Sequence, residues 1–188
     1  MMNPLEKLKL APRDWLGELL ESSPGSGFEL DAFEVIDAAD IPEHQRRLLV
    51  HDDHMTVTLE KAHGAPVHLH VLEVLHADPE YSRRLYLTAG EDGPVVMAGI
   101  MKIWLQHMGS DAVREAIVGG QTPLGRILID HGVLRKLKSC AFLRIRIDDS
   151  LRQTLSIPPS APEVTYGRLA LIFCHGEPAV ELLEIVAP

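Results

Sequence analysis

The chain has 188 residues, of which 46% are hydrophobic and 24% are charged, and its formal net charge is −9 at pH 7. This composition is typical of a single globular domain with a buried core and excludes a disordered chain. The negative charge repels nucleic-acid phosphates and anionic membranes, so we expect neither as a partner. An anionic small molecule would need a local basic cluster, which the neighbouring Arg83 and Arg84 could supply.

The N-terminal part is expected to form an extension or cap over residues 1–40, followed by the main domain over residues 41–188. An amphipathic pattern predicts a short helix over residues 14–21, and the run of Ser, Pro and Gly over residues 22–27 ends it. Residues 1–20 contain no uninterrupted apolar stretch of the kind found in signal peptides or membrane spans. We therefore expect a cytoplasmic protein, in which Cys140 and Cys174 are reduced, buried thiols.

Further helices are predicted over residues 42–50, 53–63, 111–118 and 123–130. For the second of these, Asp52 or Asp53 is the expected N-cap and Gly64 the expected end. Alternation of apolar and polar residues, or short apolar runs between turn residues, predicts six strands, at residues 67–77, 81–88, 94–103, 141–147, 169–174 and 179–186. Helices inserted between hairpin-linked strands indicate an α+β domain built on a single antiparallel sheet of about six strands.

Motifs for common cofactors and nucleophiles are absent from the sequence. The histidines at 51, 54, 68 and 70 are not accompanied by ligands at a familiar zinc spacing, so we expect no metal. The glycine-rich run over residues 119–125 lacks the lysine of a phosphate-binding loop. No serine lies in a nucleophile elbow, and covalent catalysis has no candidate residue. What is left is noncovalent chemistry on an anion, without a cofactor.

Several segments, in order along the chain, resemble the chorismate lyase family over roughly residues 48–188. They are Leu48 to Thr56, with Met-Thr at a helix start; Tyr81 to Leu87, around Arg83; Ala98-Gly99; Thr122-Pro123-Leu124-Gly125-Arg126; and the closing segments Gly176 to Pro178 and Glu184 to Pro188. Each motif is short and common when taken alone. Their shared order is much more specific.

The resemblance implies a lyase that removes pyruvate from chorismate and leaves 4-hydroxybenzoate, without metal or other cofactor. It implies that Arg83 binds a substrate carboxylate and that Glu184 lies beside the ether bond to be broken. It also implies substrate contacts at Gly99 and at the backbone N–H groups of Met55 and Leu124, where helix starts favour an anion. Arginine suits the first role because its guanidinium can form two parallel hydrogen bonds to one carboxylate.

The chain also departs from the family pattern. It has about two more residues between Arg83 and Gly99, an even number that preserves the faces of the strands. After Gly99, Ile100 to Ile103 replace a segment of the form Arg-Thr-Val-Val-Pro, which indicates a divergent member with altered substrate contacts. The segment before Leu48 has no counterpart.

Other interpretations stay open. Arg83 could be a solvated edge-strand arginine, and Glu184 an ordinary polar member of an alternating strand. The domain could be a non-catalytic binder of aromatic acids with the same fold, although no basic helix-turn-helix segment precedes it. It could also be a lyase that gives a different hydroxybenzoate. The sequence does not decide whether Glu184 donates a proton or orients substrate, which pathway is served or which oligomeric state forms.

Overall fold

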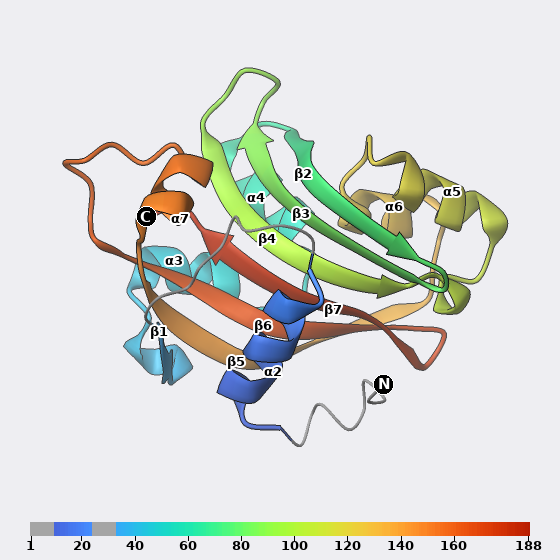
Figure 1. Cartoon of the computed structure of the whole chain (residues 1–188). Helices are drawn as coiled ribbons and strands as arrows, with labels where there is room; N and C mark the ends of the chain where they lie inside the picture. Colours follow the sequence, from blue (N-terminus) through green and yellow to red (C-terminus); the bar gives the residue numbers. More distant parts are fainter. Residues whose placement is uncertain (1–9, 24–32) are drawn as a thin grey trace.

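The computed structural model describes residues 10–23 and 33–188. Its centre is one antiparallel sheet of seven strands in the order β1-β5-β6-β7-β4-β3-β2 (Figure 1). The strands are β1 (Phe33–Ile36), β2 (Val67–Ala77), β3 (Glu80–Ala89), β4 (Val95–Trp104), β5 (Arg135–Arg146), β6 (Val164–Cys174) and β7 (Glu177–Val186). The α-helices of the described residues are α2 (Pro12–Glu21), α3 (Glu43–Leu49), α4 (Met55–His63), α5 (Asp111–Gly119), α6 (Leu124–Asp130) and α7 (Asp149–Thr154). The predicted α+β class with a single antiparallel sheet is confirmed.

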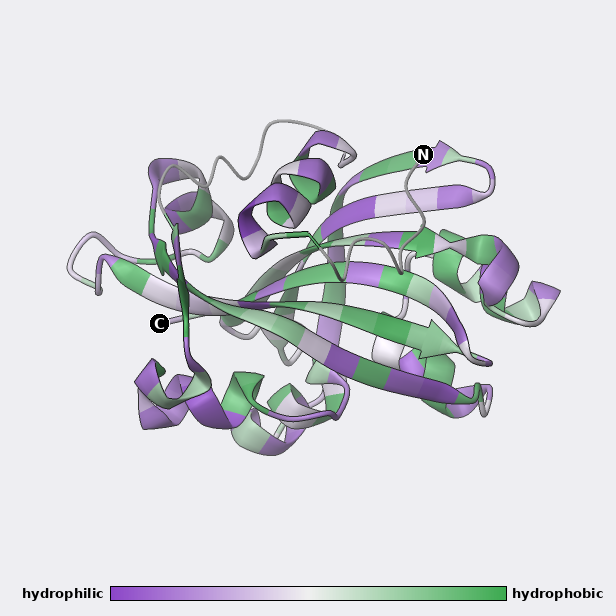
Figure 2. Cartoon of the chain, turned by 90° about the horizontal axis from the view of Figure 1, so that it is seen from below, coloured by the Kyte–Doolittle hydropathy of each residue, from purple (hydrophilic) through white to green (hydrophobic). Residues whose placement is uncertain are grey.

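The sheet is covered by helices on both faces. Buried residues of α3, α4, α5 and α6 pack with one face of the sheet in a first hydrophobic cluster, which includes Leu85, Met101 and Leu182. Buried residues of α2 and α7 pack with the opposite face in a second cluster, which includes Ile100 and Leu183. The central strands β4 and β7 are buried on both faces, so most of their residues are apolar, and Lys102, Glu181 and Glu184 are buried charged exceptions. Apolar segments run through the whole sheet in Figure 2.

Two elements of the structure are missing from the sequence prediction. Strand β1 has only four residues, too few for a clear period, and it is held by its pairing with β5 at the sheet edge. Helix α7 has six residues, and the side chain of Asp148 caps it by accepting a hydrogen bond from the Leu151 N–H at 2.7 Å. A short helix of this kind depends on its cap and on the buried Leu151 more than on its own propensity.

Some predicted boundaries were wrong. Strand β5 begins at Arg135, six residues before the predicted start, because Lys136 and Lys138 are exposed while Leu137 is buried, a regular strand alternation. The N-cap of α4 is His54 and not Asp52 or Asp53. The predicted end of α4 is confirmed, since Gly64 adopts the left-handed conformation with φ of 65°.

Part of the expected N-terminal extension packs against the sheet. Helix α2 buries Trp15, Leu16 and Leu19 in the second hydrophobic cluster, and β1 extends the sheet beside β5. Residues 1–9 and 24–32 of that region, with most of the predicted turn over residues 22–27, lie outside the described residues. None of the described helices reaches the length and apolarity needed to cross a bilayer.

Candidate functional site

The structure brings the predicted arginine and glutamate to the same face of the sheet. Arg83 on β3 lies opposite Met101 on β4, and Glu184 on β7 lies opposite Gly99 on β4. Directly paired residues, and residues two apart on one strand, point to the same face. The strand spacing places the Cα atoms of Arg83 and Glu184 about 12 Å apart. Their side chains can therefore contact the same small molecule from different sides.

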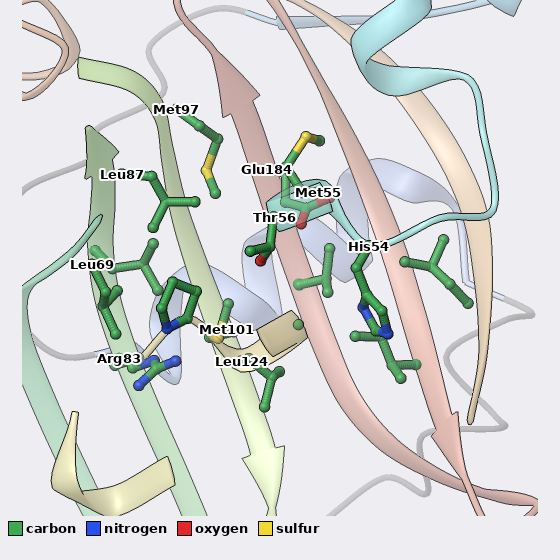
Figure 3. A pocket seen from close by; sticks show the side chains of 16 residues that line it. His54, Met55, Thr56, Leu69, Arg83, Leu87, Met97, Met101, Leu124 and Glu184 are labelled. Carbon is green, nitrogen blue, oxygen red and sulfur yellow. The ribbon is translucent and has the colours of Figure 1, made fainter. Parts of the chain in front are cut away.

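Both side chains line one cavity between this face of the sheet and helices α4 and α6 (Figure 3). The sheet contributes an apolar lining of Leu69, Leu85, Leu87, Met97, Met101, Leu137, Ile172 and Leu182. The helices and the residues that precede them contribute His54, Met55, Thr56, Pro123, Leu124 and Gly125. The cavity is thus apolar along its length and carries a cation and an anion as its charged groups.

Arg83 is completely buried and incompletely hydrogen-bonded. Its exposed fraction is 0%, and one hydrogen bond joins its Nη1 to the carbonyl oxygen of Ile117 at 3.4 Å. Its Nε and Nη2 atoms have no hydrogen-bond partner among the described residues. Burial lowers the pKa of Arg83, an effect that the nearby Tyr81 side chain partly offsets. Two N–H groups on one edge of a buried guanidinium are the arrangement that a carboxylate satisfies.

Glu184 is held by a second buried arginine that the sequence analysis did not identify. Arg168 on β6 lies directly opposite Glu184, and its Nε donates to the Glu184 Oε2 at 2.6 Å. The pair is almost completely buried, with side-chain exposures of 0% for Arg168 and 7% for Glu184. The alternation of side chains along the strand could have identified Arg168 in the sequence, because in the Tyr-Gly-Arg segment it places Arg168 on the same face as the cavity.

The starts of helices α4 and α6 lie close together at the cavity because residue 125 is a glycine. A Cβ atom on Gly125 would lie 2.7 Å from Thr56 Oγ1 and 3.0 Å from His54 Cβ. Glycine therefore lets the start of α6 approach the start of α4 closely. Met55 and Leu124, the first residues of these helices, both line the cavity. Their predicted positions at helix starts are confirmed, while their contact with a ligand is still a prediction.

Gly99 lies under the cavity, in the middle of β4. A Cβ atom at this position would lie 2.8 Å from the backbone oxygen of Leu183 and 3.4 Å from Met97 Sδ. The glycine is thus explained by the close approach of β4 to β7 in the row that contains Glu184. Gly99 itself is not among the residues that line the cavity.

His54 is a further polar group of the cavity. Arg135 Nε donates to His54 Nε2 at 2.5 Å, so this ring nitrogen is an acceptor and the neutral ring carries its proton on Nδ1. Burial, with the positive charges of Arg135 and Arg168, lowers the pKa of His54 to about 4. At neutral pH the ring is therefore uncharged.

The prediction that Arg83 and Arg84 form one basic cluster was wrong. Neighbouring residues of a strand point to opposite faces, and Arg84 forms an ion pair with Glu73 at 3.1 Å, away from the cavity. His70, one of the histidines weighed as a metal ligand, stacks on Tyr86 with ring centroids 4.6 Å apart. Within residues 10–23 and 33–188, no three His, Cys, Asp or Glu side chains gather as a metal site would require.

The cavity is narrow in this structure. Its volume is about 30 Å³, whereas a cavity of about 150 Å³ is needed for a benzene ring. A ligand with an aromatic ring must therefore displace lining side chains. Met55, Met97 and Met101 can do this at low cost, because unbranched thioether chains repack easily.

The chain shares its fold with proteins of known structure. No family model and no curated protein sequence matches the chain. The crystal structure of PhnF from Mycobacterium smegmatis matches with a TM-score of 0.51 at 14% identity, over 96% of this chain and 82% of that chain. The effector domain of PhnF from the same organism gives a TM-score of 0.49 at 14% identity, over 71% and 88% of the two chains.

The C-terminal domain of the histidine utilization repressor from Pseudomonas syringae gives a TM-score of 0.42 at 9% identity, over 64% of this chain and 90% of that chain. At these identities the likeness is one of fold, and it rests on the PhnF structure with the TM-score of 0.51. The chain therefore has an α+β fold with one antiparallel sheet, as the sequence indicated, and shares this fold with PhnF.

Gly99→Ala should destabilise the protein by about 1–3 kcal/mol, because the added methyl group meets backbone atoms that cannot move alone. The free energy of unfolding in urea measures this change. Gly119→Ala is the matched control, since a Cβ atom there meets no described atom within 4 Å and alanine favours the helix. Equal stability of the two variants would contradict the role given to Gly99.

His54 should make stability depend on pH. Its pKa of about 4 in the folded state lies below the ordinary value of 6.5. Between these values the unfolded chain takes up a proton that the folded chain does not, so stability falls as the pH is lowered through this window. His54→Gln should reduce the loss of unfolding free energy between pH 7 and pH 5 by about 1 kcal/mol, allowing for partial exposure. His63→Gln, an exposed site on the same helix, should leave the loss unchanged.

Proposed function

We propose that the protein binds a small aromatic carboxylic acid in the cavity between Arg83 and Glu184. The observation that carries the proposal is the pair of unpartnered N–H groups on the fully buried Arg83. Leaving such donors unsatisfied costs about 1–3 kcal/mol, more for a charged group. A carboxylate that accepts two hydrogen bonds from this edge would remove that cost and neutralise the charge. The fold neighbour PhnF contains a part described as an effector domain, which agrees with ligand binding by this fold.

The other groups of the cavity suit an aromatic acid with a hydroxyl group away from its carboxylate. The walls between the two charged residues are leucine, isoleucine and methionine side chains, which can contact a ring. The Glu184 Oε2 atom accepts a hydrogen bond from Arg168. The other carboxylate oxygen, Oε1, takes part in no hydrogen bond among the described residues. A ring hydroxyl could donate to Oε1 while the carboxylate meets Arg83. The 4-hydroxybenzoate molecule has this arrangement of groups.

Arg83→Met tests the binding proposal. Without ligand the variant should be more stable by about 1–3 kcal/mol, because an apolar side chain replaces a buried cation with unsatisfied donors. Its affinity for 4-hydroxybenzoate, measured by calorimetry, should fall by about 100-fold or more with the loss of two charge-assisted hydrogen bonds. Arg84→Met is the matched control, because that side chain is next in sequence but on the other face. Unchanged affinity in Arg83→Met would refute the proposal.

A second candidate function is the removal of pyruvate from chorismate. It is favoured by the presence of Glu184 in the same cavity as Arg83, in an ordered set of segments that resembles chorismate lyases. Chorismate carries a ring carboxylate and a ring hydroxyl in the same relative positions as 4-hydroxybenzoate. Elimination breaks the ether bond and the C–H bond of the ring carbon that bears the hydroxyl, the departing enolpyruvyl group gains a proton and becomes pyruvate, and aromatisation of the ring drives the reaction. With Arg168 donating to it, Glu184 would act as the acceptor that orients the substrate hydroxyl.

Incubation of the purified protein with chorismate tests this second function. Chromatography should show 4-hydroxybenzoate and pyruvate in equal amounts, without added metal. Glu184→Gln should act mainly on turnover, and Arg83→Ala mainly on substrate capture. Tight binding of 4-hydroxybenzoate with no product from chorismate would select the non-catalytic binding domain. A different hydroxybenzoate in the product would change the regiochemistry but keep the reaction class.

A further inference from the structure

Arg168 connects two parts of the candidate site that are far apart in sequence. Its guanidinium lies on β6, is completely buried and donates its Nε–H to Glu184 on the neighbouring strand β7. Its Nη1 donates to the carbonyl oxygens of Leu49 at 3.1 Å and of His51 at 2.9 Å, and Nη2 to that of Asp53 at 3.5 Å. One planar group therefore fixes a carboxylate and three backbone carbonyls at the same time.

The three carbonyl groups belong to the segment that leads from α3 into α4. This segment ends at His54, the N-cap of α4, and the next residues Met55 and Thr56 line the cavity. The position of the α4 start relative to the sheet thus depends on the bonds from Arg168. The same guanidinium sets the position of the Glu184 carboxylate, which leaves Oε1 available toward the cavity.

We propose that Arg168 is a positioning residue of the ligand site, and that it determines whether the ring hydroxyl of the ligand is recognised. The proposal rests on the proposed function, since it concerns the same ligand. Arg168 neutralises Glu184 and holds its carboxylate in the orientation in which Oε1 accepts from the ligand. The carboxylate of the ligand is bound by Arg83, on a different strand and without any contact to Arg168. Changing Arg168 should therefore affect one end of the ligand and spare the other.

The Arg168→Lys variant separates the recognition of the ring hydroxyl from the binding of the carboxylate. Lysine keeps the positive charge beside Glu184, but its ammonium group cannot reach the carboxylate and three carbonyls together. The measurement is the ratio of the affinities for 4-hydroxybenzoate and benzoate, determined by calorimetry for each variant. The two acids differ only in the hydroxyl group, so the ratio reports its recognition. A variant that merely loosened the fold would weaken both acids and leave the ratio unchanged.

The wild-type protein should bind 4-hydroxybenzoate about 10-fold or more tightly than benzoate, as expected for one hydrogen bond to a charged acceptor. In Arg168→Lys the ratio should fall to about 1–2, with the benzoate affinity within about 3-fold of the wild type. Arg83→Met is the opposite control, because it should weaken both acids together. If Arg168→Lys shows no cooperative unfolding transition, the double variant Arg168→Gln/Glu184→Gln replaces it, because it removes both buried charges. Its affinity ratio should also fall to about 1–2.

The other outcomes contradict either the role of Arg168 alone or the proposed function as well. A ratio that stays at the wild-type value in Arg168→Lys, or in the double variant, overturns the role of Arg168 and leaves carboxylate binding at Arg83 in place. A wild-type ratio near 1, with measurable benzoate binding, does the same. A wild-type protein that binds neither acid overturns the proposed function, and the role of Arg168 with it.

Discussion

The burial of two arginine side chains in one apolar layer is the constraint on which the site depends. Moving a charged group out of water costs several kcal/mol, and a protein tolerates this only where partners offset the loss. Arg168 has such partners, a carboxylate and backbone carbonyls. Arg83 has a long hydrogen bond to Ile117 and the nearby Tyr81 side chain, while its Nε and Nη2 have no partner among the described residues. Both arginines lie in the same layer, and they differ in that Arg168 is satisfied by the protein itself, whereas Arg83 keeps Nε and Nη2 without a partner within residues 10–23 and 33–188.

This contrast also bears on the role of Glu184, which the sequence left open between proton donation and orientation of the substrate. Here the carboxylate lies 2.6 Å from a guanidinium nitrogen, and one oxygen is already occupied. Recognition of a hydroxyl group by the other oxygen suits this arrangement better than delivery of a proton. The same geometry serves a binding domain and an enzyme, which is why product analysis distinguishes them and the fold does not.

The sequence predicted the residues of the site better than the contacts between them. Of the residues named from ordered motifs, Arg83, Glu184, Met55 and Leu124 line one cavity and Gly99 does not, and their role in binding stays a prediction. Arg168 was missed because its importance arises from the pairing of β6 with β7 and from carbonyl groups more than a hundred residues earlier. Arg84 was misjudged because proximity in sequence was taken for proximity in space. Strand β1 and helix α7 escaped prediction because they are short and depend on tertiary contacts.

The methionines that line the cavity have a consequence for selectivity. A pocket with rigid branched walls discriminates by shape, whereas thioether chains adjust to rings and substituents of different outline. Under the proposed function, selection among aromatic acids depends on the polar groups at the two ends of the cavity, where a mismatch leaves a buried charge without a partner. Because the cavity volume of about 30 Å³ is too small for an aromatic ring, part of the binding energy of such a ligand would be used to move the lining side chains apart. Moderate affinity and tolerance toward ring substituents are the properties that such a lining confers.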